Sequence, residues 1–382
     1  MPTFDLLPAR YYGPVFQWTL LALVLWLISA CYSGRVYLPA TRHSLGAATG
    51  VFVAFWGILV GLRPVHYVFG DTVIYAAGFN FAFAEGQYNW VEKLFSFKGE
   101  YIFETIQDFC LEFSNIHLLF FIFAVLYFGC QYLATHRLFG AYWFAPYLAM
   151  ACMIDYWGFA VNGMRNGAAA AIMTLALTYH KRLRIAIPLG ILACGIHKSM
   201  LLLAGAAILA RYFTKTKVYL ACWIGCIGLA AVAGNTISAV LSNSFLSSMD
   251  QRLSSYNAMN HDAELMRYFS HTGFRPDFLL YSAVPIAVGY WFLNMRRQDD
   301  ALYRWWLNVY IIANSFWVLN MYSFSSNRFA VLSWFIAGIV LLYPLFKFSF
   351  VRHQARIAAG VFSCWFTFFL YQNILRPLIY GY

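Results

Sequence analysis

Long apolar runs separated by short polar or basic segments dominate the pattern of this chain. Most runs are long enough, or nearly so, to cross the roughly 30 Å hydrocarbon core of a bilayer as a helix. They fall at about 14–32, 44–61, 116–134, 141–157, 164–180, 185–210, 218–234, 278–295, 305–321, 328–346 and 357–373. The pattern predicts a bundle of about ten to twelve transmembrane helices.

The run at 185–210 is compatible with two different structures. It is long enough for one tilted helix, but Gly195-Ile196-His197-Lys198-Ser199 interrupts it with polar residues. Two short helices meeting at this point would form a re-entrant hairpin that enters and leaves the membrane on the same side.

Two segments between apolar runs, 62–115 and 235–277, are too long to be simple connections. The first ends in an amphipathic pattern that predicts a helix at the membrane surface or against the bundle. Its apolar face holds Ile102, Phe103, Ile106, Phe109, Cys110 and Phe113, and its acidic face Glu100, Glu104, Asp108 and Glu112. The second segment is rich in Ser, Asn and Tyr and contains Arg252, Tyr256, His261, Arg267, His271 and Arg275.

The composition agrees with this interpretation. Of the 382 residues 62% are hydrophobic, and 11% are charged, against about 25% in a soluble domain. No internal repeat and no separate soluble domain is visible, so we expect one all-α, polytopic transmembrane domain over residues 1–382. The net charge of +11 does not indicate a nucleic-acid partner, because its distribution follows the membrane topology.

Basic residues gather in six short connections, at 33–43, 135–140, 181–184, 211–217, 296–304 and 347–356. These segments hold fifteen of the 26 Lys and Arg residues and only two of the 15 acids, which leaves eleven and thirteen for the opposite face. The positive-inside rule therefore places the six connections in the cytoplasm and both long segments outside. This topology has ten crossings, the hairpin at 185–210, and both termini outside.

The sequence offers no sign of a metal, a cofactor or a disulfide framework. Most of the eight cysteines lie inside apolar runs, and Cys222 and Cys226 have no nearby His or acidic partners for a metal site. Walker, GxSxG and HExxH motifs are absent, as is an Asp-x-Asp pair at the outer end of the first helix.

Three of the predicted inward-running helices begin with an arginine. Such helix starts present free backbone N–H groups and about half a positive charge, and an arginine adds bidentate donors for phosphate. Together they would suit a pyrophosphate head group; alternatively, they are capped helix ends whose arginines snorkel to lipid head groups. The three starts are Asn162…Arg165-Asn166, Arg275-Pro276-Asp277 and Ser325-Ser326-Asn327-Arg328.

His197 is placed at a similar depth to Arg165. At 1.5 Å per residue, the two lie about 18 Å and about 24 Å above the basic turn at 181–184. A neutral imidazole could take a proton from a sugar hydroxyl, or it could simply fix packing against a neighbouring helix. Lys198 could neutralise phosphate or snorkel, and Ser199 could orient the imidazole or cap the next helix.

Asp71 and Asp155 are the acidic candidates. Asp71 precedes Tyr75 by four residues, so on a helix the two share a face. Its carboxylate could act as base, hold a sugar hydroxyl or pair with Arg63, or it could cap the helix that follows. Asp155, just before the Arg165 helix, could pair with an arginine or bind a sugar beside Tyr156 and Trp157.

These elements resemble, in order, the EpsG-like branch of the Wzy-type polysaccharide polymerases of bacterial inner membranes. The resemblance covers roughly residues 60 to 345, and each motif is short. The motifs are Arg63…Gly70-Asp71-Thr72-Val73-Ile74-Tyr75, Gly99-Glu100-Tyr101-Ile102-Phe103, Arg165-Asn166-Gly167-Ala168-Ala169, His197-Lys198-Ser199 and Asn327-Arg328-Phe329.

The resemblance implies a GT-C/ligase-like enzyme, thought to need no metal, that polymerises repeat units linked to undecaprenyl pyrophosphate. It implies that Arg165 and Arg328 bind the pyrophosphate, assisted by Arg275 or Arg63. His197 is the first choice for the base and Asp71 the second. The remaining expected contacts to substrate come from Tyr75, Asp155, Asn162, Asn166, Lys198 and Ser199.

Other functions stay open at this stage. An O-antigen ligase or a lipid-phosphate-sugar glycosyltransferase would use the same chemistry with a different acceptor. A transporter of lipid-linked saccharide is less favoured, because the charges gather at one face and no paired repeat is visible. We expect membrane lipids, the lipid-linked oligosaccharide and the growing glycan as partners, and no nucleic acid. A Wzz-type chain-length co-polymerase is a further possible partner.

The sequence departs from the family pattern at Asn166, where the residue after the motif arginine is commonly Gln or Gly.

Overall fold

A computed structural model of the chain describes residues 7–86, 88–242, 273–295, 300–323, 326–349 and 351–380. Its regular elements within these ranges are all helices, without a strand. The predicted all-α fold is therefore confirmed. The helices form two compact units, Met1–His197 with Leu345–Tyr382, and Lys198–Pro344.

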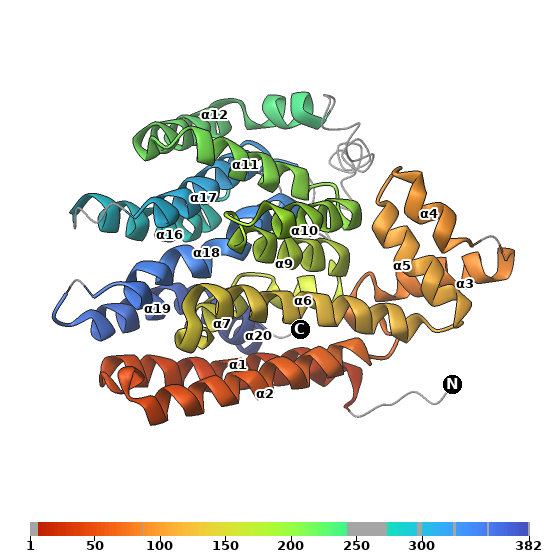
Figure 1. Ribbon diagram of the computed structural model, residues 1–382, viewed down its shortest axis with the longest axis horizontal. Helices are drawn as coiled ribbons and strands as arrows, with labels where there is room; N and C mark the ends of the chain where they lie inside the picture. The colour runs from red at the N-terminus through yellow and green to blue at the C-terminus, as the bar shows by residue number, and fades with distance from the viewer. Residues whose placement is uncertain are drawn as a thin grey trace. The chain divides into compact units, whose positions relative to one another are not determined.

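The first unit is built on long helices that run side by side. In it α1 packs on α2 and α19, and α2 packs on α6 (Figure 1). Shorter helices cover this layer on one side and at one end. The helices are α1 (Ala9–Tyr32), α2 (Pro39–Gly61), α3 (Thr72–Glu85), α4 (Trp90–Ser96), α5 (Tyr101–Glu112), α6 (Ile116–Phe139), α7 (Phe144–Ala151), α8 (Tyr156–Val161), α9 (Met164–Thr178), α10 (Leu183–Ile196), α19 (Gln354–Leu370) and α20 (Arg376–Tyr380), with the short turns η1 (Arg35–Tyr37), η2 (Tyr67–Phe69), η3 (Gly140–Tyr142) and η4 (Tyr371–Leu375).

The second unit is organised around α17, against which α11, α12 and α16 pack. Indole N–H groups tie it together by donating to partners on neighbouring helices. Trp305 Nε1 lies 2.9 Å from the Ala207 carbonyl oxygen, and Trp334 Nε1 lies 2.7 Å from Ser282 Oγ. Its helices are α11 (Met200–Tyr212), α12 (Thr216–Ser242), α16 (Pro276–Met295), α17 (Ala301–Leu319) and most of α18 (Asn327–Lys347).

Seven of the described helices are long and apolar enough to cross a membrane. The chain is thus a multi-pass membrane protein. Of the other predicted crossings, 164–180 and 305–321 are the single helices α9 and α17, whereas 141–157 and 185–210 each divide into two shorter helices. The run at 141–157, for example, breaks into α7 and α8 because the chain turns at Asp155, whose φ of 66° is left-handed.

The ambiguous run at 185–210 consists of two short helices. α10 ends at Ile196, His197 is extended (φ −147°, ψ 118°), and α11 begins at Met200. A single continuous helix over this run is therefore wrong. The return of the chain to the same side of the membrane stays a prediction.

The long segment at 62–115 contains three helices, α3, α4 and α5, which gather beside one end of α6 (Figure 1). The predicted amphipathic helix is α5, but its two faces are not divided as the pattern suggested. Asp108, expected on the polar face, is buried and accepts a hydrogen bond from the Asn89 N–H at 3.1 Å, whereas Phe109 and Phe113 are exposed. Because α4 packs on α5, part of the acidic face points into the protein.

The second long segment, predicted at 235–277, is shorter at its start because α12 continues to Ser242 with a kink at Ala233. Residues 243–272 lie outside the described residues. Arg252, Tyr256, His261, Arg267 and His271 belong to this range.

Small residues bring the helices of the first unit close together. α9 carries Gly167 followed by four alanines, all buried, and it packs against α6, α8 and α10. A Cβ at Gly167 would lie 2.9 Å from the Tyr127 ring. Close approach of this kind is how helices associate in a membrane, where apolar side chains alone provide little driving force.

We expect Gly167→Ala to destabilise the protein by about 1–3 kcal/mol, because the added methyl group must displace the backbone of α8 or the Tyr127 ring. The measurement is thermal unfolding in detergent. Gly129→Ala on α6 is the matched control: its Cβ meets no atom within 4 Å, so the change should leave stability unchanged or raise it by up to about 1 kcal/mol. Equal stability of the two variants would contradict the packing argument.

Candidate functional site

Arg165 lies at the first turn of α9 and is enclosed by residues from α3 and α5. Its Nε–H donates to the Tyr75 hydroxyl at 3.1 Å, and one terminal nitrogen lies 2.8 Å from Glu100 Oε2. The guanidinium also lies over the rings of Tyr75 and Phe103, at 5.4 and 4.6 Å. The carboxylate of Asp71 interacts with it electrostatically. The side chain is only 15% exposed, so these contacts hold the charge in a defined position.

His197 reaches the same carboxylate from another helix. It directly follows α10, and its Nε2 lies 3.8 Å from Glu100 Oε1. Glu100 therefore stands between the arginine and the histidine, with one oxygen toward each. The predicted proximity of Arg165 and His197 is realised through this shared acid.

Glu100 is the member of the cluster that we did not predict as a site residue. It occupies the N-cap position of α5, after Gly99 in a left-handed conformation (φ 64°). α5 also packs against α10 where Gly195 leaves room, since a Cβ at Gly195 would lie 3.0 Å from the Tyr101 ring. A sequence signal existed, because Glu100 begins the acidic face of the amphipathic segment and belongs to one of the family-like motifs.

Asp71 is held beside the cluster by Asn162. The Asp71 N–H donates to Asn162 Oδ1 at 2.7 Å, which ties the start of α3 to the turn before α9. Gly70 has φ 60°, and a Cβ there would lie 2.5 Å from the same oxygen, so only glycine fits. Asp71 occupies the N-cap position of α3, yet its carboxylate makes no capping hydrogen bond. The sequence prediction that Asp71 and Tyr75 share a helix face is confirmed by the Tyr75 N–H, which donates to the Asp71 carbonyl at 2.9 Å.

Arg63 lies next to this region but faces the protein interior. Its side chain is fully buried, and it donates to the carbonyl oxygens of Val60 at 2.8 Å and Val161 at 3.1 Å. Its Nε–H donates to Thr72 Oγ1 at 3.3 Å, and the guanidinium lies 4.2 Å from the Phe120 ring centre. In this arrangement Arg63 fastens the end of α2 to α3, α6 and α8.

Asp155 and Asn166 lie in the same unit as the cluster. Asp155 precedes α8, and its carboxylate lies against Gly158. No ion pair joins it to Arg165 in the described part of the chain. Asn166 is buried in the first turn of α9.

The remaining predicted residues belong to the second unit. Arg275 is paired within its own helix start: Nε and a terminal nitrogen lie 3.0 and 2.7 Å from the two carboxylate oxygens of Asp277. Arg328 is half-buried at the start of α18, and Lys198 and Ser199 precede α11. The grouping of these four residues with Arg165 stays a prediction.

The cluster in the first unit combines a held cation, a carboxylate bridge and an imidazole. This arrangement can bind an anion and can accept a proton from a hydroxyl. Within the described ranges, no three His, Cys, Asp or Glu side chains gather in a way that could hold a metal ion.

Comparison with known proteins identifies the family. The sequence profile of the EpsG family matches residues 50–382, which is most of the chain. The chain belongs to the EpsG family. This confirms the resemblance drawn from the motifs and makes the chain a membrane protein of the polysaccharide-polymerase type. No curated protein and no solved structure matches it.

We expect Glu100→Gln to lower polymer formation at least about tenfold, because it removes the carboxylate that positions both Arg165 and His197. The measurement is polymer yield at matched protein level in membranes. Glu104→Gln is the control, one turn further along α5. This change breaks the ion pair between Glu104 and Lys93, whose side chains are 40% and 45% exposed respectively. Because an ion pair this exposed contributes little, polymer yield should hardly change. Similar yields from both variants would remove Glu100 from the site.

Proposed function

We propose that this EpsG family member polymerises oligosaccharide repeat units linked to undecaprenyl pyrophosphate, at the outer face of the bacterial inner membrane. The acceptor is a non-reducing-end hydroxyl of a new lipid-linked unit. Its oxygen bonds to C1 of the donor glycan while the bond from C1 to the pyrophosphate oxygen breaks. The hydroxyl proton passes to a base of the protein, and undecaprenyl pyrophosphate leaves with the bonding electrons.

The proposal rests on the enclosed position of the Arg165 guanidinium and on its unused N–H donors. A guanidinium has five N–H donors, and the hydrogen bonds to Tyr75 and Glu100 use two of them. The others have no protein acceptor in the described part of the chain. A largely enclosed, fixed guanidinium with donors to spare suits a phosphate oxygen that gains negative charge as the bond to C1 breaks.

The charge balance of the cluster indicates that Arg165 does not act alone. Together with Arg165, the first unit contributes two carboxylates, Glu100 and Asp71. A pyrophosphate carries several negative charges, so further cations are needed to hold it. From the sequence motifs we propose Lys198, Arg275 and Arg328 for this role.

His197 is the favoured base because of its contact with Glu100. An imidazole that takes the acceptor proton becomes an imidazolium, and a carboxylate at 3.8 Å from Nε2 stabilises that charge and orients the ring. Asp71 interacts electrostatically with the Arg165 guanidinium. Asp71 then serves to hold the arginine or a sugar hydroxyl.

The proposed reaction needs no metal ion, since fixed cations take the place of one at the leaving group. The outer-face location is supported by the charge distribution along the sequence. It requires the cluster to lie at the ends of the helices opposite to the basic connections. Within the first unit this holds: the cluster neighbours the end of α2 and the start of α6, and the basic segments 33–43 and 135–140 flank the other ends of these helices.

We expect Arg165→Ala to abolish polymerisation at unchanged protein level, because losing one fixed donor to a leaving group costs about 2.7–4 kcal/mol of transition-state stabilisation. The measurement uses purified protein in nanodiscs with a lipid-pyrophosphate-linked repeat unit, in the presence of EDTA, with the glycan ladder resolved on a gel. Wild type should give a ladder. Arg184→Ala, an exposed arginine at the start of α10, should behave as wild type.

Substantial polymer from Arg165→Ala would contradict the assignment of the leaving-group site. Loss of the wild-type ladder on adding EDTA would contradict the metal-free mechanism. If no glycan ladder forms but the substrate moves between the leaflets of a liposome, the protein is a transporter and not a polymerase.

We expect His197→Gln to reduce turnover by about 10²–10⁴-fold, the usual contribution of a general base, and Asp71→Asn to reduce it less. Glutamine keeps a hydrogen-bonding group at position 197 but cannot accept the proton. Single-turnover rates of chain extension at saturating substrate measure the chemical step. A larger loss from Asp71→Asn than from His197→Gln would make Asp71 the base.

A further inference from the structure

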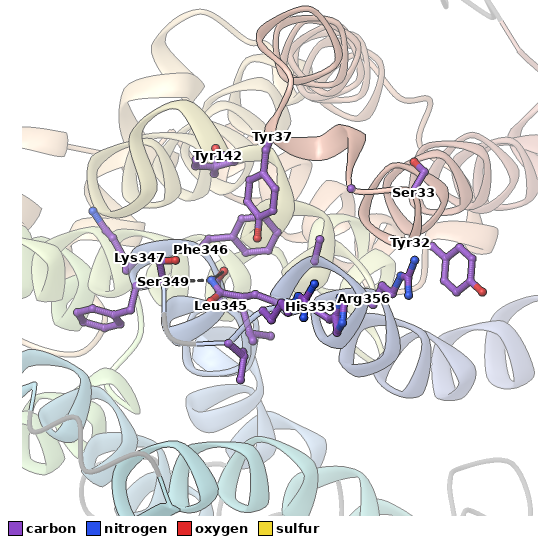
Figure 2. A pocket seen from close by; sticks show the side chains of 16 residues that line it. Tyr32, Ser33, Tyr37, Tyr142, Leu345, Phe346, Lys347, Ser349, His353 and Arg356 are labelled. Carbon is purple, nitrogen blue, oxygen red and sulfur yellow. Dashed lines mark hydrogen bonds between the residues drawn. The ribbon is translucent and has the colours of Figure 1, made fainter.

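A basic pocket of about 660 Å³ opens in the first unit, formed by the ends of α1 and α18, η1, η3 and the start of α19. Figure 2 shows Tyr37, Tyr142 and Phe346 gathered together, with His353 and Arg356 farther along the lining. The size falls within the range of ligand pockets, about 300–1,000 Å³. None of its lining residues belongs to the Arg165 cluster.

The charged side chains of the pocket all carry the same sign. Lys347, Arg352 and Arg356 line it together with His353, and no acidic side chain is among the described lining residues. Within the described part of the chain, none of the three cations forms an ion pair. Arg356 lies over the ring of Tyr32, 5.8 Å from its centre, and remains exposed.

Two carbonyl oxygens at the pocket already accept hydrogen bonds from the protein. Gln354 Nε2–H groups donate to the carbonyl oxygens of Leu345, at 2.6 Å, and of Phe348. The hydroxyl of Ser33 donates to the Ser29 carbonyl at 2.8 Å, at the end of α1. α19 begins here, so its positive N-terminal end adds to the field of the cations. The pocket therefore presents donors and positive charge to a ligand.

The surroundings favour a lipid over a soluble anion. α1, α2 and α18 are candidate membrane spans whose ends form or adjoin the pocket, which places it at the boundary between apolar and polar surroundings. Tyr32 and Tyr37 are 68% and 41% exposed, as tyrosines at a membrane interface are. Leu345, Phe346 and Val351 add an apolar part to the lining, next to the cations.

We propose that this pocket binds the phosphate head group of an anionic phospholipid. Basic pockets between transmembrane helices are known to hold such head groups. Lys347, Arg352 and Arg356 take the phosphate, and the apolar lining receives the glycerol and the first acyl carbons.

The pocket is remote from the Arg165 cluster. The two lie at opposite ends of α6, whose 24 residues span about 36 Å. The proposal is independent of the proposed reaction, and it stands or falls by lipid binding alone.

The test titrates full-length purified protein in a neutral detergent with dioctanoyl phosphatidylglycerol, and counts bound lipid by native mass spectrometry. Dioctanoyl phosphatidylcholine and inorganic phosphate are the comparison ligands. The test variant is Arg352→Gln/Arg356→Gln, at two exposed positions of the pocket. The control variant is Lys181→Gln/Arg184→Gln, which removes the same charge from exposed positions that do not line this pocket.

We expect the phosphatidylglycerol Kd to rise about tenfold to thirtyfold in the pocket variant, because each cation near an anionic lipid contributes several-fold to binding. The control variant should stay within about twofold of wild type. Phosphatidylcholine should bind wild type more weakly, and a large excess of inorganic phosphate should leave the lipid bound.

Equal losses in the two variants would overturn the proposal, since they indicate general attraction to a basic surface. Phosphatidylcholine binding as tightly as phosphatidylglycerol would overturn the assignment of an anionic ligand. Displacement of the lipid by inorganic phosphate would make the pocket a site for a free anion.

Discussion

The ion pair between Arg165 and Glu100 is the interaction on which the rest of the candidate site depends. It joins the first turn of α9 to the start of α5 across a 2.8 Å contact between two largely enclosed side chains. An arginine this poorly hydrated is costly unless a carboxylate and further hydrogen bonds accompany it. Tyr75 supplies one of these bonds, and Gly70, Gly167 and Gly195 allow the segments to approach closely enough. The packing of the first unit therefore determines whether the side chains of the candidate site can meet.

The sequence was sufficient to predict the elements of the fold but not all of their interruptions. Apolar length and helix-start residues located α1, α2, α6 and most later helices, because membrane helices are long and uniform. The division of 141–157 into α7 and α8 depends on the local turn at Asp155, which hydropathy does not register. Asp108 is buried because α4 packs over α5, a tertiary contact without a signature in the helical pattern.

The candidate site shows the same limit. Arg165 and His197 could be named because ionisable groups in apolar segments stand out, and Asp71 and Tyr75 because their spacing places them on one helix face. Glu100 was not named, because an acid on an amphipathic helix is ordinarily solvated, and its contact with His197 depends on the packing of α5 against α10 near Gly195. Arg63 was expected to assist a pyrophosphate, whereas its observed contacts are with carbonyl oxygens of the protein. A charged residue in an apolar sequence can be identified as a candidate site residue, but its contact partners depend on how the helices pack around it.

The contact between Gly70 and Asn162 has an evolutionary consequence. The Asn162 amide occupies the space that any side chain at position 70 would need, and it also accepts the hydrogen bond of the Asp71 N–H across 91 positions of the chain. Neither residue can change freely while the other is kept. In an alignment of EpsG family members, these two distant positions should therefore be inherited as a pair, and a sequence that has lost one should have lost the other.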